Sequence, residues 1–152
     1  MAKVLKTGNM SRCLGCLTCV LVCAAANRQS HSVQKSCIKI KTSGGISGKF
    51  VETVCHACTE AACAEVCPAN ALVSRAGGGV LLEKGKCIGC RRCQEACVVG
   101  AVNFDEDAKQ PIICHHCGLC ARYCPHGCLF MEEAQDAEAV VEVGISQMDA
   151  EY

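Results

Sequence analysis

The stretch that decides the fold is Cys114-His115-His116-Cys117-Gly118-Leu119-Cys120-Ala121-Arg122-Tyr123-Cys124-Pro125. Its four cysteines are spaced C-x2-C-x2-C-x3-C, and a proline directly follows the last of them. The same spacing recurs at residues 13–23 (block one) and 87–97 (block three). Residues 55–67 (block two) carry a variant with two extra residues before the third cysteine, and residues 114–124 are block four. The blocks use sixteen of the eighteen cysteines and leave out Cys37 and Cys128. The chain is therefore built around one recurring cysteine unit.

The composition indicates a fold held together by more than apolar side chains. Cysteine accounts for 18 of the 152 residues, whereas aromatic residues make up only 3%. A cysteine share above roughly 8–10% is typical of chains stabilised by disulfides or metal centres. Residues 1–12 contain no apolar segment of the kind found in a secretory signal. We therefore expect a cytoplasmic protein, because a reducing compartment favours metal ligation by cysteine over disulfides.

Two classes of function do not fit this composition. No run approaches the roughly 18 apolar residues of a membrane helix, so no membrane span is expected. The 15 basic and 15 acidic residues balance, and few aromatic side chains are present for base stacking. Nucleic-acid binding is therefore not expected either.

The cysteine spacing suits a cubane [4Fe–4S] cluster, in which each of four irons takes one thiolate. Three cysteines two residues apart can wrap one loop around three irons, while the fourth begins a helical turn and points away. That fourth cysteine is expected to bind the other cluster of a pair. Zinc ribbons instead use separated C-x2-C pairs, for which a third cysteine is surplus. We therefore predict four [4Fe–4S] clusters, with a zinc-binding interaction module as the alternative.

Spacing alone leaves the pairing of the blocks open. Blocks two and three begin 32 residues apart (87 − 55), and blocks three and four begin 27 residues apart (114 − 87). Either sequential or nested pairing is sterically plausible over such distances.

The residues around the blocks are expected to support the clusters rather than bind them. After the fourth cysteine, a left-handed turn is expected at the third place, which is filled by Asn70, Gly100 and Gly127. Cys128 stands where two other blocks have alanine, which predicts a small buried side chain. Cys37 falls on the same side of an alternating segment as Lys39 and Lys41, which predicts the polar face of a strand. The histidines near the blocks are expected beside the clusters or on the surface: His56, His115, His116 and His126.

The remaining sequence predicts an α+β fold of tandem βαβ-type modules. Strands are predicted at residues 49–54, 71–75, 80–83, 101–104 and 111–113, with Gly77-Gly78-Gly79 as a hairpin turn. A short helix is predicted at 59–66, and an amphipathic helix at 132–143. We expect one four-cluster domain over residues 1–131, followed by an acidic C-terminal helix or tail over residues 132–152.

Charge is unevenly distributed along the chain. Residues 1–49 contain eight basic residues and no acidic one, and residues 125–152 contain seven acidic residues and no basic one. Both regions are accounted for by ordinary solvated surfaces. The alternative is that one end docks a partner, or that opposite ends of neighbouring copies attract each other.

Four such blocks in one short chain resemble the four-cluster electron-transfer subunits of molybdenum and tungsten oxidoreductases. That family includes the iron–sulfur subunits of dimethyl sulfoxide reductase, formate dehydrogenase and hydrogenase complexes. The resemblance covers residues 13–130, although family members often have a longer second block with a proline. Here that segment is the compact Cys58-Thr59-Glu60-Ala61-Ala62-Cys63. The chain is therefore more similar to the small polyferredoxin subunits of cytoplasmic tungsten enzymes, above all aldehyde oxidoreductase and also tungsten-type benzoyl-CoA reductase.

The resemblance implies a bacterial ferredoxin-like fold and a function in electron transfer, with no catalytic site in this chain. The implied partner is a large catalytic subunit that holds a tungsten or molybdenum pterin. A flavin- or NAD-linked subunit, or a soluble ferredoxin, is the implied second partner, and the setting is anaerobic metabolism. The alternative within electron transfer is a free soluble polyferredoxin.

The resemblance also implies nested pairing, in which block one pairs with block four and block two with block three. In this arrangement the first pair of clusters takes Cys13, Cys16, Cys19 and Cys124, and then Cys114, Cys117, Cys120 and Cys23. The second pair takes Cys55, Cys58, Cys63 and Cys97, and then Cys87, Cys90, Cys93 and Cys67.

Overall fold

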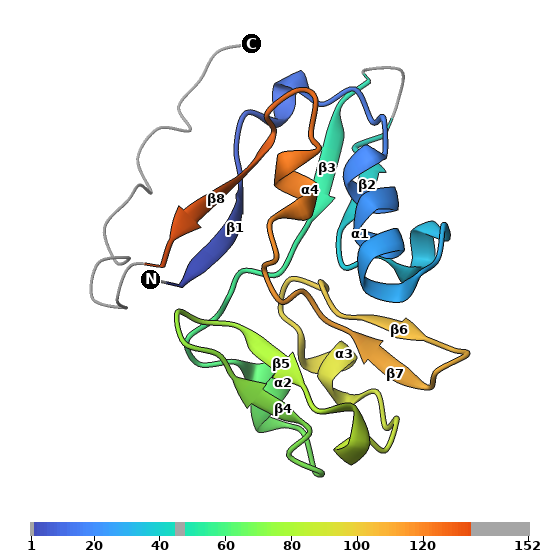
Figure 1. Cartoon of the computed structure of the whole chain (residues 1–152), viewed down its shortest axis with the longest axis vertical. Coiled ribbons are helices and arrows are strands. Elements are labelled where there is room, and N and C mark those ends of the chain that lie inside the picture. Colours follow the sequence, from blue (N-terminus) through green and yellow to red (C-terminus); the bar gives the residue numbers. More distant parts are fainter. Residues whose placement is uncertain (1, 45–47, 135–152) are drawn as a thin grey trace.

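Each cysteine block lies between two strands and carries its third cysteine on a short helix (Figure 1). The structure is a computed structural model that describes residues 2–44 and 48–134. In chain order the strands, helices and 3-10 turns (η) are β1 (Lys3–Thr7), η1 (Met10–Arg12), α1 (Thr18–Arg28), η2 (Val33–Lys35), β2 (Lys39–Thr42), β3 (Phe50–Thr53), α2 (Ala62–Glu65), β4 (Leu72–Ser74), β5 (Val80–Leu82), η3 (Lys84–Lys86), α3 (Arg92–Ala96), β6 (Asn103–Asp105), β7 (Gln110–Ile112), α4 (Leu119–Arg122) and β8 (Leu129–Glu133).

The strands join one block to the next. The strand after each block pairs with the strand before the following one, which gives the pairs β2–β3, β4–β5 and β6–β7. The fourth pair, β1–β8, joins the first strand to the last, with Lys3 opposite Glu133 and Thr7 opposite Leu129. All four pairs are antiparallel and form separate two-stranded sheets. The mixed helix and strand composition agrees with the predicted α+β class, and the pairs link the blocks in a ring.

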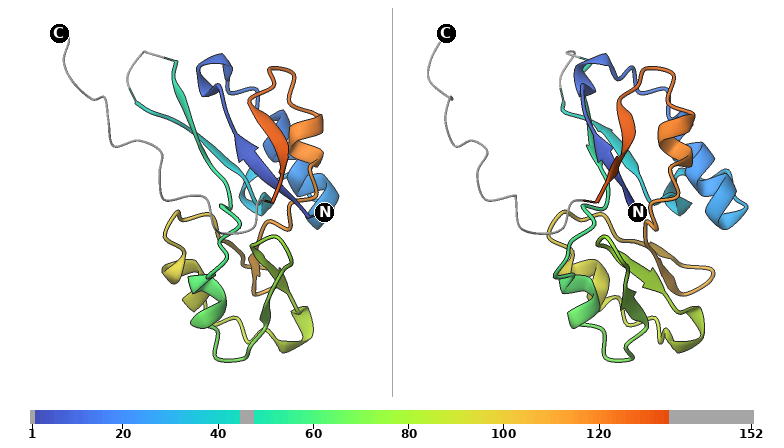
Figure 2. Two further views of the ribbon diagram at one scale, coloured as in Figure 1. Left: turned by 90° about the vertical axis from the view of Figure 1, so that its left-hand side faces the viewer. Right: turned by 60° about the vertical axis from the view of Figure 1, so that its left-hand side comes forward.

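The ring is folded into two halves, one above the other in Figures 1 and 2. The terminal half (residues 2–54 and 114–134) contains β1, β2, β3, β8, α1 and α4, and α1 packs against α4. The central half (residues 55–113) contains β4 to β7, α2 and α3, and α2 packs against α3. Blocks one and four therefore share one half, and blocks two and three share the other.

Both halves have small apolar cores that include block cysteines. The core of the terminal half contains Leu5, Val20, Ile38, Val54 and Leu129, together with Cys19, Cys23 and Cys120. The core of the central half contains Ala61, Leu72, Val80 and Val102, together with Cys93. Since so few large side chains are buried, the cysteines and whatever they bind form much of the interior.

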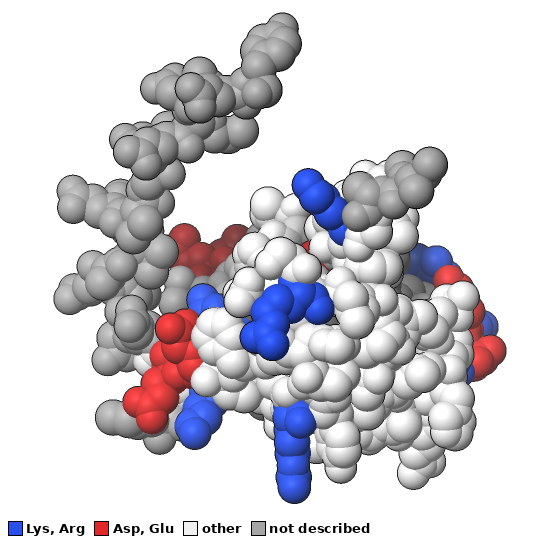
Figure 3. Space-filling view, turned by 90° about the horizontal axis from the view of Figure 1, so that it is seen from above, with Lys and Arg blue, Asp and Glu red and all other residues white. Residues whose placement is uncertain are grey.

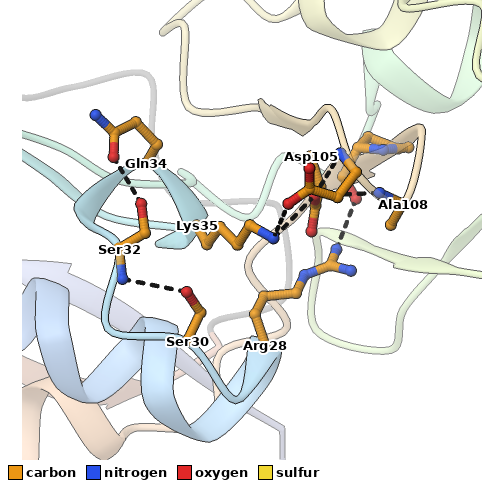
Figure 4. A network of polar contacts seen from close by, with 9 residues as sticks. Arg28, Ser30, Ser32, Gln34, Lys35, Asp105 and Ala108 are labelled. Carbon is orange, nitrogen blue, oxygen red and sulfur yellow. Dashed lines mark hydrogen bonds and ion pairs between the residues drawn. The ribbon is translucent and has the colours of Figure 1, made fainter.

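Polar contacts join the two halves on the side of η2 (Figure 4). The Lys35 ammonium lies 3.4 Å from an Asp105 carboxylate oxygen and 2.6 Å from one of Asp107. The Arg28 guanidinium donates a hydrogen bond of 3.0 Å to the carbonyl oxygen of Pro111. These contacts tie α1 and η2 to the β6–β7 hairpin and fix the position of the central half.

Most of the predicted elements are confirmed, and one is wrong at its start. The predicted strands at 49–54, 71–75, 80–83, 101–104 and 111–113 correspond to β3 to β7, and the short helix at 59–66 to α2. Glu132 and Glu133 belong to β8 rather than to a helix, because Glu132 lies opposite Val4 and its backbone pairs with β1. The rest of the helix predicted up to residue 143 lies outside the described residues. No described helix is long and apolar enough to cross a bilayer.

Candidate metal centres

Three recesses in the protein are each lined by four block cysteines. Each contains three cysteines from one loop and a fourth from a different block. The block-one recess is lined by Cys13, Cys16, Cys19 and Cys124, the block-four recess by Cys114, Cys117, Cys120 and Cys23, and the block-three recess by Cys87, Cys90, Cys93 and Cys67.

The remaining block cysteines also lie close together. Burial raises the pKa of Cys63 to about 11, and the charges of Cys55, Cys97 and Cys58 add to this effect. The Cys55 thiol likewise has a raised pKa, because of burial and of neighbouring Cys58 and Cys97. We call these four cysteines the block-two set. Twelve of the sixteen predicted ligands thus line recesses in groupings that nested pairing implies, and the mutual influences of the other four agree with it. Iron binding by these cysteines and the pairing of the blocks stay predictions.

Left-handed backbone conformations recur at equivalent places in the block loops. The residue before the second cysteine has a positive φ in all four blocks: Gly15 (65°), Ala57 (53°), Gly89 (70°) and His116 (58°). The residue after the second cysteine has one in three blocks: Leu17 (57°), Arg91 (64°) and Gly118 (78°). Alternating right- and left-handed residues turn successive N–H groups to one side and create concavities that hold anions, iron–sulfur clusters among them. Only the glycines could have signalled this from the sequence, since the other four residue types rarely adopt such a conformation.

The fourth cysteine of each block accepts a backbone hydrogen bond on its sulfur. In three blocks the donor is the residue four places on: Ala71 N–H to Cys67 (3.3 Å), Ala101 to Cys97 (3.3 Å) and Cys128 to Cys124 (3.4 Å). The predicted left-handed turn that makes this possible is confirmed, with φ of 47° at Asn70, 65° at Gly100 and 62° at Gly127. In block one, α1 continues past Cys23, and the N–H of Cys37 donates instead, at 3.3 Å.

The crowded thiols favour a positively charged occupant. Burial raises the pKa of Cys19 to about 11, and that of Cys114 and Cys120 to about 12, with further increases from neighbouring cysteines of the same set. Thiolates in such sites repel one another unless a cation compensates their charge, and metal binding therefore releases protons. Within the described part of the chain, no three His, Cys, Asp or Glu side chains converge closely enough to hold a single metal ion. The donor set fits a cluster that offers a separate iron to each sulfur.

The charges of some cysteines act on those of another set, which indicates which sets lie near one another. Cys19 of the block-one recess influences Cys120 of the block-four recess. Cys55 of the block-two set influences Cys114, and Cys93 of the block-three recess influences Cys63. The sets therefore follow one another as block one, block four, block two and block three. Leu14 and Ile88 are each 68% exposed, and they lie in the loops at the two ends of this series.

His116 is the most deeply buried histidine among the described residues. It is only 5% exposed, and its Nδ1 accepts the N–H of Leu5 at 3.0 Å. Burial, followed by the positive charge of Arg75, lowers its pKa to about 4. A methyl group at Gly79 would lie 3.3 Å from His116 Nε2, so the ring sits between the block-four loop and the β4–β5 hairpin. The prediction that it supports the site from beside the cysteines fits this position.

The structure corrects the prediction for Cys37 and confirms that for Cys128. Cys37 is 4% exposed and precedes β2, so it is buried in the terminal core rather than placed on a polar strand face. Its contact with Cys23 comes from 14 residues away and leaves no signal in the local pattern. Cys128 is 3% exposed, as expected for a small buried side chain.

The basic N-terminal region does not form one free surface. Lys35 binds Asp105 and Asp107, and Lys39 donates to the Gly100 carbonyl at 2.7 Å. Figure 3 shows the molecule from above, where separate Lys and Arg side chains stand on a largely uncharged face. Of the seven acidic residues in the stretch 125–152, the structure describes Glu132 and Glu133. The docking alternative therefore stays a prediction.

The sequence has relatives among known proteins. No protein-family model matches the sequence. It is 32% identical over 146 residues to YsaA of Escherichia coli (strain K12), a candidate electron transport protein, and the match covers 86% of this chain and 88% of YsaA. This protein belongs to the same family as YsaA. The sequence match therefore extends over most of both proteins.

Other relatives are parts of oxidoreductases. The arsenate respiratory reductase iron–sulfur subunit ArrB of Shewanella sp. (strain ANA-3) is 30% identical over 64% of this chain. The B subunit of anaerobic dimethyl sulfoxide reductase from Escherichia coli (strain K12) is 29% identical over 76%. The present sequence spans only 43% and 66% of the lengths of these two proteins. Homologues of this protein are thus iron–sulfur subunits of oxidoreductases.

A solved structure supports the fold. The active site complex BamBC of benzoyl-coenzyme A reductase, as isolated, matches with a TM-score of 0.50 at 20% identity. The match covers 87% of this protein and 77% of the matched subunit. At this identity the likeness concerns the arrangement of the backbone.

Proposed function

We propose that the chain transfers single electrons through four [4Fe–4S] clusters as a non-catalytic subunit of an oxidoreductase complex. The observation that carries this proposal is the gathering of sixteen cysteines into four sets, each with three cysteines from one loop and one from another block. Such a division of ligands is typical of proteins with paired cubane clusters. The iron–sulfur subunits among the relatives support the same conclusion.

The bound clusters would supply the redox chemistry, since each accepts and passes on one electron. The chain's own residues hold the sulfurs, orient backbone N–H groups toward them and keep neighbouring sets near one another. The series from block one through blocks four and two to block three is then the path of electrons. Exposed Leu14 and Ile88 at its two ends suit contact with redox partners.

For the catalytic partner we propose a large subunit with a tungsten or molybdenum pterin, of the aldehyde oxidoreductase type. The compact second block supports this choice. Benzoyl-CoA reductase, formate dehydrogenase and hydrogenase complexes are the alternatives, and a free polyferredoxin would need no catalytic partner. Electrons would leave to a flavin- or NAD-linked subunit or to a soluble ferredoxin, in the cytoplasm of an anaerobically growing cell.

The first test is anaerobic purification followed by analysis of metal and acid-labile sulfide. Four cubanes predict about 16 iron and about 16 sulfide per chain. After reduction with dithionite, the electron paramagnetic resonance (EPR) spectrum should show interacting [4Fe–4S]⁺ centres. Two to four zinc ions with no sulfide would instead support the zinc-binding module and overturn the proposal.

The second test concerns the partner. The tagged protein should be purified anaerobically from its native host, and bound proteins identified by mass spectrometry. Recovery of a large subunit that contains tungsten or molybdenum supports the subunit proposal. Recovery of the iron-loaded protein alone, under low salt and without dilution, favours the free polyferredoxin.

A further inference from the structure

Two of the four cysteine sets contain a fifth cysteine. Cys128 lines the block-one recess beside the four predicted ligands, and Cys37 lines the block-four recess in the same way. Both belong to the terminal half. The sets of the central half have alanine at the corresponding places, Ala71 and Ala101. The two halves therefore differ at one matched position in each of their sets.

These four residues correspond because of a shared hydrogen bond. Each donates its backbone N–H to the sulfur of a fourth cysteine, over 3.3 to 3.4 Å. All four are buried, with exposed fractions of 4% for Cys37, 3% for Cys128, 1% for Ala71 and 4% for Ala101. The correspondence of Cys37 is visible only in three dimensions, because it reaches Cys23 across 14 residues. Only the side chain distinguishes the cysteine sites from the alanine sites.

The two extra thiols reach the sulfur of a predicted ligand. The side chains of Cys37 and Cys23 are hydrogen-bonded, and this bond is the largest of the causes that lower the pKa of Cys23 to about 5. Both residues line the same recess, and the Cys37 backbone N–H already lies 3.3 Å from the Cys23 sulfur. Because Cys23 is a predicted cluster ligand and Cys37 is not, Cys37 would be the S–H donor and Cys23 the thiolate acceptor. Cys23 accepts two further bonds, from the Cys37 N–H and from the Asn27 side-chain amide at 3.5 Å.

The Cys128 thiol makes a similar but shared contact. Cys128 is not a predicted ligand, so its sulfur would carry a proton. It lines the block-one recess beside Cys124 and Cys13, and its backbone N–H lies 3.4 Å from the Cys124 sulfur. Its sulfur also lies 3.9 Å from the carbonyl oxygen of His126, a competing acceptor. The hydrogen bond to Cys124 is therefore expected to be weaker than that from Cys37 to Cys23.

We propose that Cys37 and Cys128 are positioning residues that donate S–H hydrogen bonds to ligand sulfurs and raise the reduction potentials of the two clusters in the terminal half. This inference rests on the proposed function. A hydrogen bond to a thiolate withdraws negative charge from the cluster and favours its reduced state, which carries one more negative charge. The alanines leave the central clusters without this donor. Electrons are thereby drawn toward the terminal half.

The test is a redox titration of the iron-loaded, full-length protein, followed by low-temperature EPR. Cys37→Ala should lower the potential of one cluster, and Cys128→Ala should lower that of a different cluster by less. A hydrogen bond of ordinary strength implies up to about a tenfold change in the reduction equilibrium, which is about 59 mV for one electron. The other potentials should not move, and about 16 iron per chain should remain.

The reciprocal variants Ala101→Cys and Ala71→Cys serve as matched controls and should raise the potential of one central cluster each. Cys37→Ser retains a hydrogen-bond donor, so its potential should lie closer to the wild-type value than that of Cys37→Ala. It also provides the measurement if Cys37→Ala does not fold. Full iron content with no shift in either Cys37 variant overturns the inference. Loss of four iron in either variant also overturns it, because the residue would then be a ligand. Absence of iron from the wild-type protein would instead refute the proposed function.

Discussion

At the scale of single residues, backbone conformation and N–H donors matter as much as the cysteines. The sixteen block cysteines can be picked out from the sequence because their spacing is a local property, and ligation by them stays a prediction. The sequence missed the left-handed conformations of Leu17, Ala57 and Arg91, since their residue types give no signal. Holding a non-glycine residue there costs about 1–2 kcal/mol. Because this costly left-handed conformation recurs at equivalent places in the blocks, we infer that the loops are shaped to hold an occupant.

The nested grouping can be tested by counting iron in double variants. Cys16→Ser with Cys124→Ser removes two ligands of one set, so one cluster should be lost and about 12 iron should remain. Cys16→Ser with Cys117→Ser affects two sets and should leave about 8 iron. Metal analysis of anaerobically purified proteins separates the two values. With sequential pairing, Cys124 would belong with block three, and the first variant would also fall to about 8 iron.

His116 predicts a pH dependence of stability. Its folded pKa of about 4 lies below the ordinary 6.5. Its contribution is therefore complete above pH 6.5 and is lost as the pH falls toward 4, by at most about 3 kcal/mol. His116→Asn keeps an acceptor for the Leu5 N–H and tolerates a positive φ, but does not titrate in this range. Urea unfolding at several pH values should show the stability advantage of the wild type shrinking between pH 7 and pH 4. A constant difference would contradict this.

At the scale of elements, local hairpins were predictable and distant pairings were not. The β4–β5 and β6–β7 hairpins follow from alternating residues on either side of a turn. The pairing of β1 with β8 joins residues far apart in the chain, such as Leu5 and Met131 (131 − 5 = 126 positions), and no local sequence pattern predicts it. Glu132 and Glu133 at the end of β8 fit a helical pattern equally well. They form a strand because their backbone pairs with β1. The terminal half is therefore closed by a long-range strand pairing that local residue propensities do not predict.

The glycine turn between β4 and β5 also packs against the block-two loop. Gly79 donates its N–H to the Cys58 carbonyl at 3.0 Å, and a methyl group on Gly78 would lie 2.1 Å from the carbonyl oxygen of Ala57. The hairpin therefore packs directly on the block-two loop. Gly78 also has a φ of 89°. Glycine is required here by close approach as well as by conformation.

Gly78→Ala should therefore be clearly destabilising. We expect a loss of about 2–5 kcal/mol in the free energy of unfolding, from the left-handed conformation and the backbone clash together. Gly100→Ala is the matched control, because its φ is 65° but no atom lies within 4 Å of the added methyl. It should lose only about 1–2 kcal/mol in the same denaturant titration. Equal losses in the two variants would show that the hairpin does not press on the block-two loop.

At the scale of the whole molecule, each half buries few apolar side chains. Among the described residues, the main apolar cluster of the central half has four buried side chains besides Cys93, and one of them is alanine. A domain of this size needs more buried apolar surface, or a substitute, to be stable. The four cysteine sets lie in both halves and along their junction, so their occupants would complete the interior.

Removal of iron should consequently unfold the protein. In the emptied sites, the buried thiols of Cys114 and Cys120, with pKa values of about 12, would be protonated at pH 7 and would no longer join separate blocks. Anaerobic treatment with a strong iron chelator should abolish cooperative thermal unfolding, as followed by far-ultraviolet circular dichroism. Adding ferrous iron with sulfide and a thiol reductant should restore the transition, whereas zinc alone should not. A sharp transition in the iron-free protein would mean that the chain folds without its clusters. Restoration by zinc would mean that its sites are suited to a different metal.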